Sequence, residues 1–300
     1  MKILIIGANG FTGRRMLIRF SAGSGLSGGL AYTVTGSSLH PDLFPGNGYR
    51  FIPADLLDDP AVEEMIRTVA PDVVVNTSAL SVPDYCEQHR SEAYAMNVSA
   101  VRHLAECCER ANCRLIHLST DFVFDGRGRT LYTETDRPAP VNYYGETKWL
   151  GEQAVAEICR RYAIVRVVVV YGKALPGQHG NVLQLVKTRL ENKQPVRVVS
   201  DQWRTPTWVE DICSGVELLI ASEANGIFHL CGRECLSIAE IAYRVADYFR
   251  LDRSLILPVT TAEMKETTLR PAFSGLSIDK AMRELGYAPH TLEEGLREWK

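Results

Sequence analysis

The chain has 300 residues, 46% of them hydrophobic and 23% charged, which is enough to bury a core as one large domain or two smaller ones. Its net charge of −3 excludes the strong positive field that attracts nucleic acids or anionic membranes, so neither partner is expected. No apolar run approaches the roughly 20 residues of a membrane span. The eight cysteines lack zinc-site spacing, and we expect a cytoplasmic protein with reduced, mostly buried cysteines and no metal site.

Apolar runs alternate with helical patterns through the first 170 residues. Strands are predicted at 2–6, 31–35, 50–53, 71–79, 114–119 and 164–170, and helices at 12–22, 61–69, 91–111 and 144–162. Continuous Val/Ile runs between helices are typical of a parallel sheet that is covered on both faces. The predicted fold class is therefore α/β, a Rossmann-like doubly wound sheet, and such sheets bind ligands at the carboxyl ends of their strands.

The alternation becomes less regular after Gly172. Helices are predicted at 182–193, 209–222 and 238–249, strands at 196–200 and within 226–232, a turn at 201–207, and two short helices near the end. No repeat or low-complexity linker separates the two halves. We expect residues 1–171, with roughly 207–230, to form the sheet domain, and residues 172–206 and 231–300 to form a smaller C-terminal α/β lid.

Three glycines, Gly7, Gly10 and Gly13, directly follow the first predicted strand and precede a helix. Glycines permit a tight turn and the close approach of a pyrophosphate, and a helix N-terminus offers unpaired N–H groups to it. Alone, such a triplet is a weak signal that also fits a plain strand–helix turn. Its position at the start of an α/β pattern favours a dinucleotide-binding loop.

The segment "TVTGSS", at the end of the second strand, contains no carboxylate. NAD sites usually place an acidic residue there to hold the ribose 2′-hydroxyl. Arg14, Arg15, Ser37 and Ser38 could instead bind a 2′-phosphate, although the two arginines are equally consistent with solvated helix charges. We therefore expect NADPH as the cofactor, with NADH as the alternative.

The segment "NYYGETKWLGE" holds two adjacent tyrosines and a lysine. Tyr144 lies four residues before Lys148 and Tyr143 lies five before it, so only Tyr144 shares a helix face with the lysine. A neighbouring ammonium lowers the pKa of a phenol from about 10 and makes it a useful proton donor. We predict Tyr144 and Lys148 as catalytic, against a plain surface helix, and expect Tyr143 to pack or to contact substrate.

The glycine spacing and the Tyr-x-x-x-Lys pair together resemble the extended short-chain dehydrogenase/reductase superfamily. The resemblance implies that Thr120 polarises the substrate carbonyl, with Ser119 as the alternative donor. It also implies that Lys148 holds the nicotinamide ribose and that Asp55 contacts the adenine amine. Asn97 would organise a proton path to the lysine, unless it is a simple helix-surface asparagine.

Within that superfamily, "STDFVFDG" at 119–126 resembles the dTDP-4-dehydrorhamnose reductase family. Further matches cover nearly the whole chain, in "NTSALSVPDYCE", "YGETKWLGE", "VVSDQWRTPTWVEDI", "GIFHLCG" and "RPAFSGLSIDK". The departures, at 80–81, 83–85 and 203–204, fall where substrate specificity would be decided. Among them, Arg204 adds a cation to the expected substrate cleft, where it could meet a pyrophosphate.

This resemblance implies NADPH-dependent reduction of the C4 keto group of a dTDP-4-keto-6-deoxyhexose, with Tyr144 as proton donor. A homodimer is expected. Cofactor contacts are expected from Gly7, Asn9, Gly10, Phe11, Thr12, Gly13, Arg14, Ser37, Asp55, Leu56, Ser78, Ala79, Leu80, Asn97, Ser119, Tyr144 and Lys148. Substrate contacts are expected from Ser81, Asp84, Asp121, Phe122, Tyr143, Asn181, Gln202, Trp203, Arg204 and Arg270.

Three other functions remain as alternatives. A dTDP-glucose dehydratase of the superfamily would need Asp-Glu after the threonine, and here Asp121 precedes Phe122. An epimerase would keep the same triad but would differ in the "VFDG" segment. The regulatory β subunit of methionine adenosyltransferase resembles the same reductase family and acts through protein contacts, and intact Tyr144, Lys148 and Thr120 argue against that role.

Overall fold

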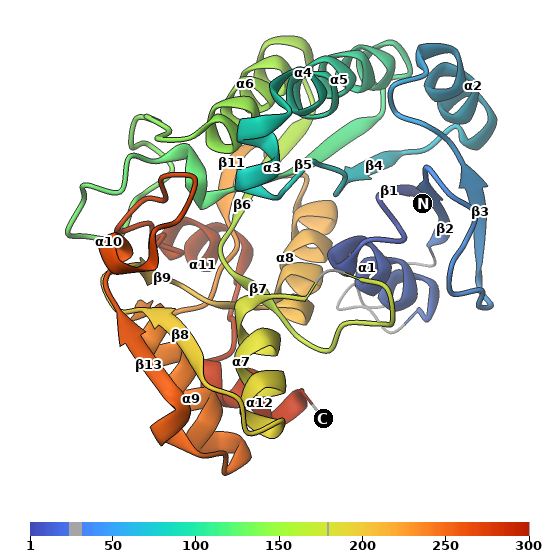
Figure 1. The fold of residues 1–300 in the computed structure, drawn as a ribbon. Coiled ribbons are helices and arrows are strands. Elements are labelled where there is room, and N and C mark those ends of the chain that lie inside the picture. Colours follow the sequence, from blue (N-terminus) through green and yellow to red (C-terminus); the bar gives the residue numbers. More distant parts are fainter. Residues whose placement is uncertain (24–31, 179, 300) are drawn as a thin grey trace.

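The computed structural model describes residues 1–23, 32–178 and 180–299 (Figure 1). Its main element is a seven-stranded parallel sheet with the order β11-β6-β5-β4-β1-β2-β3. The strands are β1 (Lys2–Ile6), β2 (Thr33–Ser38), β3 (Tyr49–Pro53), β4 (Val73–Asn76), β5 (Arg114–Thr120), β6 (Tyr162–Val167) and β11 (Gly226–His229). The predicted Rossmann-like class is confirmed, and the strand order reverses at β1 and β4, where doubly wound sheets bind ligands.

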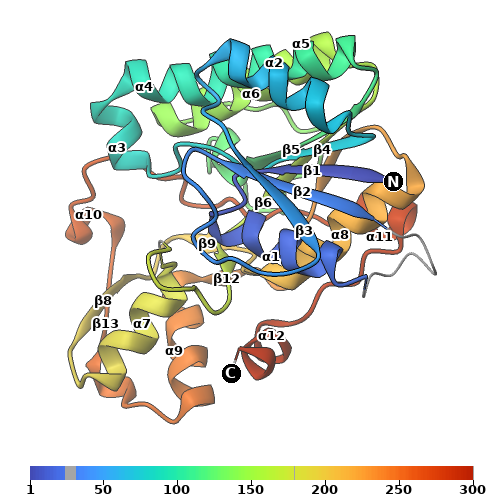
Figure 2. The ribbon, with the colours of Figure 1, turned by 90° about the vertical axis from the view of Figure 1, so that its right-hand side faces the viewer.

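Helices cover both faces of this sheet (Figure 2). One layer contains α1 (Phe11–Ser21), α8 (Val209–Ser222) and α11 (Asp279–Leu285), and the other contains α2 (Asp59–Val69), α5 (Ala100–Arg110) and α6 (Tyr143–Ile158). Alternate side chains of each strand face alternate layers, so that Ile3 and Ile5 join the first core and Leu4 and Ile6 the second. Strands with two covered faces are apolar throughout, which explains the Val/Ile runs.

A third hydrophobic core lies in a smaller unit, at the lower left of Figure 1. Its helices are α7 (Val182–Glu191), α9 (Ile238–Phe249) and α12 (Leu292–Glu298). Its strand pairs are β7 (Val170–Tyr171) with β10 (Thr207–Trp208), β9 (Trp203–Arg204) with β12 (Leu236–Ser237), and β8 (Val196–Val199) with β13 (Ile256–Val259). The predicted domain limits remain a proposal.

The remaining elements are short: α3 (Pro83–Gln88), α4 (Arg90–Tyr94), a π-helical turn η1 (Ala95–Ser99), the 3₁₀ turns η2 (Asp121–Val123) and η3 (Arg253–Leu255), and α10 (Thr261–Met264). All eight cysteines are free thiols, and all but Cys235 are buried, as expected. Within the described ranges, no helix combines the length and the apolar character that crossing a membrane requires.

Several predicted boundaries differ from the structure. The predicted strand at 31–35 begins at Thr33 and continues to Ser38, and Ala31 lies outside the described residues. The predicted strand at 71–79 contains only β4, because the Asn76 side chain accepts the backbone N–H of Ser78 at 3.0 Å and turns the chain. The helix predicted at 144–162 ends at Ile158. The strands β9, β10 and β13 and the helix α3 were not predicted, since they are short and irregular in pattern.

The helix predicted at 91–111 contains the π turn η1. Its Asn97 amide accepts the backbone N–H of Leu80 and donates to the Leu80 carbonyl, both at 2.9 Å, and also donates to Thr147 Oγ1 at 3.1 Å. A Cβ atom on Gly151 would lie 2.5 Å from the Asn97 carbonyl oxygen, so only glycine lets α6 approach this closely. Such π turns are frequent at functional sites, and this one fixes the loop after β4 against α6.

Candidate active site

A cleft of about 690 Å³ lies at the carboxyl ends of β1, β4 and β5 and joins the glycine loop to α6. It brings together many of the side chains predicted from the sequence. Those that line it are Gly7, Asn9, Gly10, Phe11, Thr12, Gly13, Ser78, Ala79, Ser81, Ser119, Tyr144, Lys148 and Asn181.

The glycine loop forms the floor of one end of this cleft. Gly7 has φ of +82°, and a Cβ atom there would lie 2.5 Å from Thr77 Oγ1. A Cβ atom on Gly13 would lie 2.3 Å from the Gly7 carbonyl oxygen, which shows how closely α1 packs on the loop. Gly10 is the N-cap of α1, and no side chain caps the helix there. The first turn of α1 therefore directs backbone N–H groups toward a position that suits a pyrophosphate.

Substituting Gly13 is expected to disrupt this end of the cleft. Gly13→Ala would force the Gly7 carbonyl away, and we expect the Kd for NADPH to rise about tenfold or more, equivalent to about 1.4 kcal/mol. Gly10→Ala is the matched control, because its Cβ atom would lie 3.1 Å from the same carbonyl oxygen and should have a smaller effect. Fluorescence titration with NADPH measures both constants, and equal losses would contradict this packing argument.

The segment at the end of β2 also contributes to the lining of the cleft. Ser38, which was predicted as a possible 2′-phosphate ligand, lines the cleft there, together with Leu39, His40 and Leu43, which were not predicted. Their position directly after β2, where the ribose is expected, is the signal that could have identified them. Leu118 and Gln178, which also line the cleft, were missed as well.

Arg14, predicted to bind a 2′-phosphate, is buried and bonds elsewhere in this structure. Its Nη1 atom is 2.9 Å from Asp42 Oδ1, its Nη2 atom donates to the Tyr49 hydroxyl at 3.1 Å, and its guanidinium lies over the rings of Phe44 and Tyr49. It does not line the cleft. Asp42, the acidic residue of this loop, is thus paired with Arg14, and Ser38 and His40 are the polar residues at the end of β2 that line the cleft.

The remaining predicted cofactor residues support the cleft from outside it. Ser37 is buried, and its carbonyl accepts the N–H groups of Gly7 and Ala8 at 2.9 Å. Asp55 accepts the N–H of Leu57 at 2.9 Å, and Leu56 is buried in the core beside α2. Leu80 and Asn97 bond to each other, as described above.

The helix α6 presents the tyrosine–lysine pair. Asn142 caps it by accepting the N–H of Gly145 at 2.8 Å, and a Cβ atom on Gly145 would lie 2.1 Å from the Phe122 carbonyl oxygen. Only Tyr144 of the two tyrosines lines the cleft with Lys148. Tyr143 lies outside the cleft lining, and its ring lies 4.7 Å from the Arg90 guanidinium.

The protonation of this pair is governed mainly by burial. Burial lowers the pKa of Lys148 to about 8, against the opposing charge of Glu152. Burial also raises the pKa of Tyr144; the Thr120 hydrogen bond opposes the rise and the Asp121 charge adds to it. The expectation that Lys148 lowers the tyrosine pKa is thus not met in this structure, where the amine bonds to the Leu118 carbonyl at 2.8 Å.

The hydroxyl pair at the end of β5 divides into one bonded and one unpaired group. Thr120 Oγ1 donates to Asp121 Oδ1 at 3.1 Å and accepts the N–H of Phe122 at 3.2 Å. Ser119 Oγ is buried, lines the cleft and has no hydrogen-bond partner among the described residues. The Phe122 ring packs edge-on against Tyr144 with centroids 5.7 Å apart. Ser119 is therefore the hydroxyl that is free to form a hydrogen bond with a bound ligand.

Asp121 joins the sheet unit to the smaller unit. Its Oδ2 atom accepts the Ser274 hydroxyl and lies 3.6 Å from Arg204 Nε. Arg204 is only 2% exposed, and its Nη2 group donates to the Pro271 carbonyl at 2.8 Å and to Gln202 Oε1 at 3.3 Å. The cation expected in an open substrate cleft is thus enclosed, because backbone carbonyls and Asp121 surround it.

Other predicted substrate residues lie in two places. Arg270 Nη2 is 3.2 Å from Asp84 Oδ2, and its Nε is 3.1 Å from Glu266 Oε1. These ion pairs tie the segment after α10 to α3. Gln202 donates to Glu266 Oε2 at 2.9 Å. Trp203, at 39% exposure, instead lines a separate cleft of about 550 Å³, so the structure does not bring it to Tyr144.

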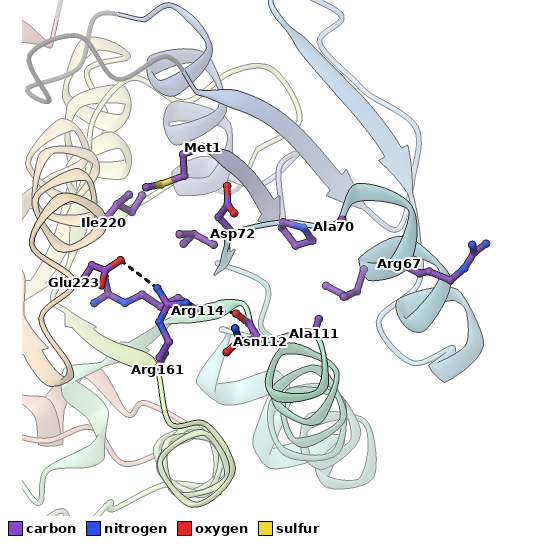
Figure 3. Close-up of a pocket in the computed structure, with 13 residues that line it drawn as sticks. Met1, Arg67, Ala70, Asp72, Ala111, Asn112, Arg114, Arg161, Ile220 and Glu223 are labelled. Atoms are coloured by element: carbon purple, nitrogen blue, oxygen red, sulfur yellow. Dashed lines mark hydrogen bonds and ion pairs between the residues drawn. The ribbon is translucent and has the colours of Figure 1, made fainter.

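A second large cleft, of about 660 Å³, lies near the amino ends of β1, β4 and β5 (Figure 3). Arg114 lies in it and donates to the carbonyls of Leu219 and Ala224 at the end of α8, while Arg161 pairs with Glu223 at 3.2 Å. Burial lowers the pKa of Arg114 to about 10. Because these cations serve carbonyls and a carboxylate of the chain itself, we assign this cleft a structural role.

One cluster of potential metal ligands occurs in the described part of the chain. Glu63, His103 and Cys107 place ligand atoms within 4.8 Å of one another on α2 and α5. The Arg110 guanidinium already bonds to Glu63 Oε1 at 2.8 Å and to Cys107 Sγ at 3.2 Å. The Arg110 guanidinium therefore already bonds to two of the three potential ligand atoms.

Comparison with known proteins gives consistent matches along the chain. The family model for the RmlD substrate binding domain matches residues 1–299. A dTDP-4-dehydrorhamnose reductase of Sinorhizobium fredii is 34% identical over 253 residues, 81% of this chain and 84% of that protein. The methionine adenosyltransferase 2 subunit beta of Mus musculus is 31% identical over 311 residues, 99% of this chain and 86% of that protein.

A solved structure agrees with these sequence matches. The dTDP-4-dehydrorhamnose reductase of Bacillus anthracis, in complex with NADP, has a TM-score of 0.84 at 26% identity, over 99% of this chain and 98% of that one. The backbone arrangement described above therefore recurs in an NADP complex.

Proposed function

Since the chain belongs to the RmlD substrate binding domain family, we propose that it is an NADPH-dependent reductase of the C4 keto group of a dTDP-4-keto-6-deoxyhexose. The observation that carries this proposal is the single cleft in which a dinucleotide-type glycine loop meets Tyr144 and Lys148. Nucleotide-sugar reduction is supported by the names of similar proteins, and the particular sugar is our proposal.

The residues of the cleft fit a nicotinamide dinucleotide. A Cβ atom on Gly7 or on Gly13 would clash with neighbouring atoms, so the loop is closely packed where a pyrophosphate would bind. The Ser119 hydroxyl has no hydrogen-bond partner among the described residues and could bond to a ligand. Gly7, Gly10 and Gly13 would hold the pyrophosphate, and Lys148 would hold the nicotinamide ribose. We propose NADPH rather than NADH because the described lining includes no carboxylate and because the similar Bacillus anthracis structure contains NADP.

When bound, this cofactor supplies the hydride, and the chain supplies position and protons. Tyr144 donates a proton to the oxygen that becomes the hydroxyl group. Burial raises the pKa of this phenol, so that it remains protonated at neutral pH, the form that a reduction requires. Thr120, at the end of β5, and Ser119, whose hydroxyl has no partner among the described residues, would be the hydroxyl donors to the carbonyl oxygen.

Substrate selection is proposed to occur at the far end of the cleft from the glycine loop. Ser81 and Asn181 line it, and Tyr143, Asp84 and Arg270 lie around the start of α6 and α3. Arg204 and Gln202 act instead as enclosed supports that hold the smaller unit against Asp121. A homodimer is kept as a proposal, which light scattering on the purified protein tests.

A second candidate function rests on one similarity. The match to the methionine adenosyltransferase 2 subunit beta covers 99% of this chain, more than the match to the Sinorhizobium reductase covers. A protein of that type would bind the dinucleotide and act through a partner enzyme. The complete Tyr144–Lys148–Thr120 set favours the reductase.

The deciding experiment follows the loss of 340 nm absorbance with NADPH and dTDP-4-keto-rhamnose. We expect steady turnover with NADPH, slower turnover with NADH, and little with a UDP-linked analogue. Turnover with another 4-keto sugar alone would keep the reductase and replace the substrate. Tight NADPH binding without turnover on any 4-keto sugar nucleotide would overturn the reductase in favour of a binding subunit.

A further inference from the structure

His117 is a fully buried histidine of β5 that the proposed reaction does not use directly. In the register of the sheet it lies beside Asn76 of β4, and its Nδ1 atom is 3.2 Å from Asn76 Nδ2. Its other ring nitrogen, Nε2, is 3.2 Å from Lys148 Nζ. The imidazole therefore connects a neighbouring strand to the lysine of the cleft.

The Asn76 amide determines where the imidazole carries its proton. Asn76 Oδ1 accepts the backbone N–H of Ser78, so its NH₂ group is the part that faces His117. An amide NH₂ group only donates, and His117 Nδ1 must therefore accept. The single proton of the neutral ring then lies on Nε2, and this N–H points at the Lys148 amine.

The Lys148 amine can meet this N–H in only one protonation state. A neutral amine has a lone pair that accepts from Nε2–H while it donates to the Leu118 carbonyl, 2.8 Å away. An ammonium has only donors and would face a second donor. The other ring tautomer would place an N–H on Nδ1, facing the NH₂ donor of Asn76. Rotating the Asn76 amide would instead place its NH₂ donor against the N–H of Ser78. Either change would leave two donors facing each other. In this buried site, the neutral amine alone satisfies every group.

One surrounding charge, that of Glu152, favours the ammonium, but this carboxylate is paired with Arg166. The titratable groups near Lys148 and Tyr144 are Glu152 on α6, Arg166 on β6, Asp121 on η2 and Cys86 on α3. The Glu152 carboxylate accepts two hydrogen bonds from Arg166, at 3.0 and 2.7 Å, and is thus already paired. Burial, the larger cause, holds the pKa of His117 well below its usual range, which keeps the ring neutral.

We propose that Asn76 and His117 form a positioning pair that presents an N–H group to Lys148 and holds its amine neutral until the anionic cofactor binds. This inference rests on the proposed function, because it assigns the charging of Lys148 to the arrival of NADP(H). The phosphate groups favour the ammonium, which then contacts the ribose and makes the neighbouring Tyr144 a stronger acid. Cofactor binding and activation of the tyrosine are in this way coupled through one proton.

The test follows the Lys148 side chain directly. In protein labelled with [ε-¹³C]lysine, the Lys148 resonance, assigned with Lys148→Arg, is titrated with pH without cofactor. We expect its midpoint to rise by about one pH unit in His117→Leu, because the opposing N–H group is lost. Ile116→Val, on the same strand but in the opposite core, is the control and should leave the midpoint unchanged.

A second variant covers the case in which His117→Leu does not fold. Asn76→Asp keeps the side-chain shape, and its carboxylate accepts from Ser78 and from His117 Nδ1–H, which turns Nε2 into an acceptor for the ammonium. Its midpoint should rise as well. An unchanged or lower midpoint in the folded variants would overturn the proposal, since His117 would then accept from the ammonium or have no influence.

Adding NADP⁺ separates this inference from the proposed function. In the wild-type protein the cofactor should raise the Lys148 midpoint, with uptake of a proton at pH values between the two midpoints. A wild-type protein that binds no NADP⁺ would sink the proposed cofactor, while the cofactor-free titration would still decide the role of His117. Binding of NADP⁺ with no change in midpoint would overturn the coupling.

Discussion

Tyr144→Phe is expected to lower kcat for NADPH oxidation with a dTDP-4-keto sugar by about 10³-fold, within the range that a general acid contributes. The substitution removes the hydroxyl that lines the cleft beside Lys148 and leaves a ring of the same shape against Phe122. The Kd for NADPH should therefore change little. Steady-state rates at 340 nm, together with fluorescence titration of the cofactor, measure the two quantities separately.

Tyr143→Phe is the matched control for that prediction. Tyr143 is adjacent in sequence, but its ring meets Arg90 and lies outside the cleft lining. We expect kcat within about threefold of the wild-type value, with any effect confined to the KM for the sugar nucleotide. Equal losses of kcat in the two variants, or full activity in Tyr144→Phe, would contradict the assignment of Tyr144 as the proton donor.

The second large effect is expected on stability, at the ion pair of Glu152 and Arg166. Both side chains are almost completely enclosed, with exposures of 3% and 1%, and two hydrogen bonds join them. Glu152→Ala would leave the Arg166 guanidinium buried and deprived of its two side-chain hydrogen bonds. We expect the free energy of unfolding to fall by about 3–5 kcal/mol, as measured by urea denaturation.

Two controls separate charge burial from loss of packing. Glu157→Ala removes the partner of Arg102 on the exposed side of the same helix, and this pair should be worth about 0–1 kcal/mol. A double variant, Glu152→Leu with Arg166→Met, removes both charges and should recover much of the stability lost in Glu152→Ala. A double variant less stable than the single one would mean that packing, and not the stranded charge, sets the cost.

The sequence was sufficient for the sheet and the tyrosine–lysine pair because both depend on local patterns. Buried parallel strands are apolar at every position, and residues four apart on a helix share a face, so β1, β4, β5 and the Tyr144 face of α6 could be predicted. The glycine loop could be predicted because its three glycines lie directly between the first strand and a helix.

The remaining parts of the site depend on contacts between distant segments. Whether Arg14 is open to a ligand depends on Asp42, and whether Arg204 is open depends on Asp121 and Pro271. The direction of the Tyr144 pKa shift likewise depends on burial, which a spacing of four residues does not reveal. His117 was overlooked because an isolated histidine in a strand carries no pattern. Its importance comes from Asn76 and Lys148, which lie 41 and 31 residues away.

The order of the strands has a consequence for synthesis on the ribosome. Six of the seven sheet strands lie within the first 167 residues, but the edge strand β11 comes from 226–229, and the core of the smaller unit includes Trp299. At translation rates of about 5–20 residues per second, synthesis of β11 would follow that of β6 by up to about ten seconds. During that interval the free edge of β6 is an unpaired template for another chain. The growing polypeptide should therefore depend on ribosome-associated chaperones more than the stability of the folded protein suggests.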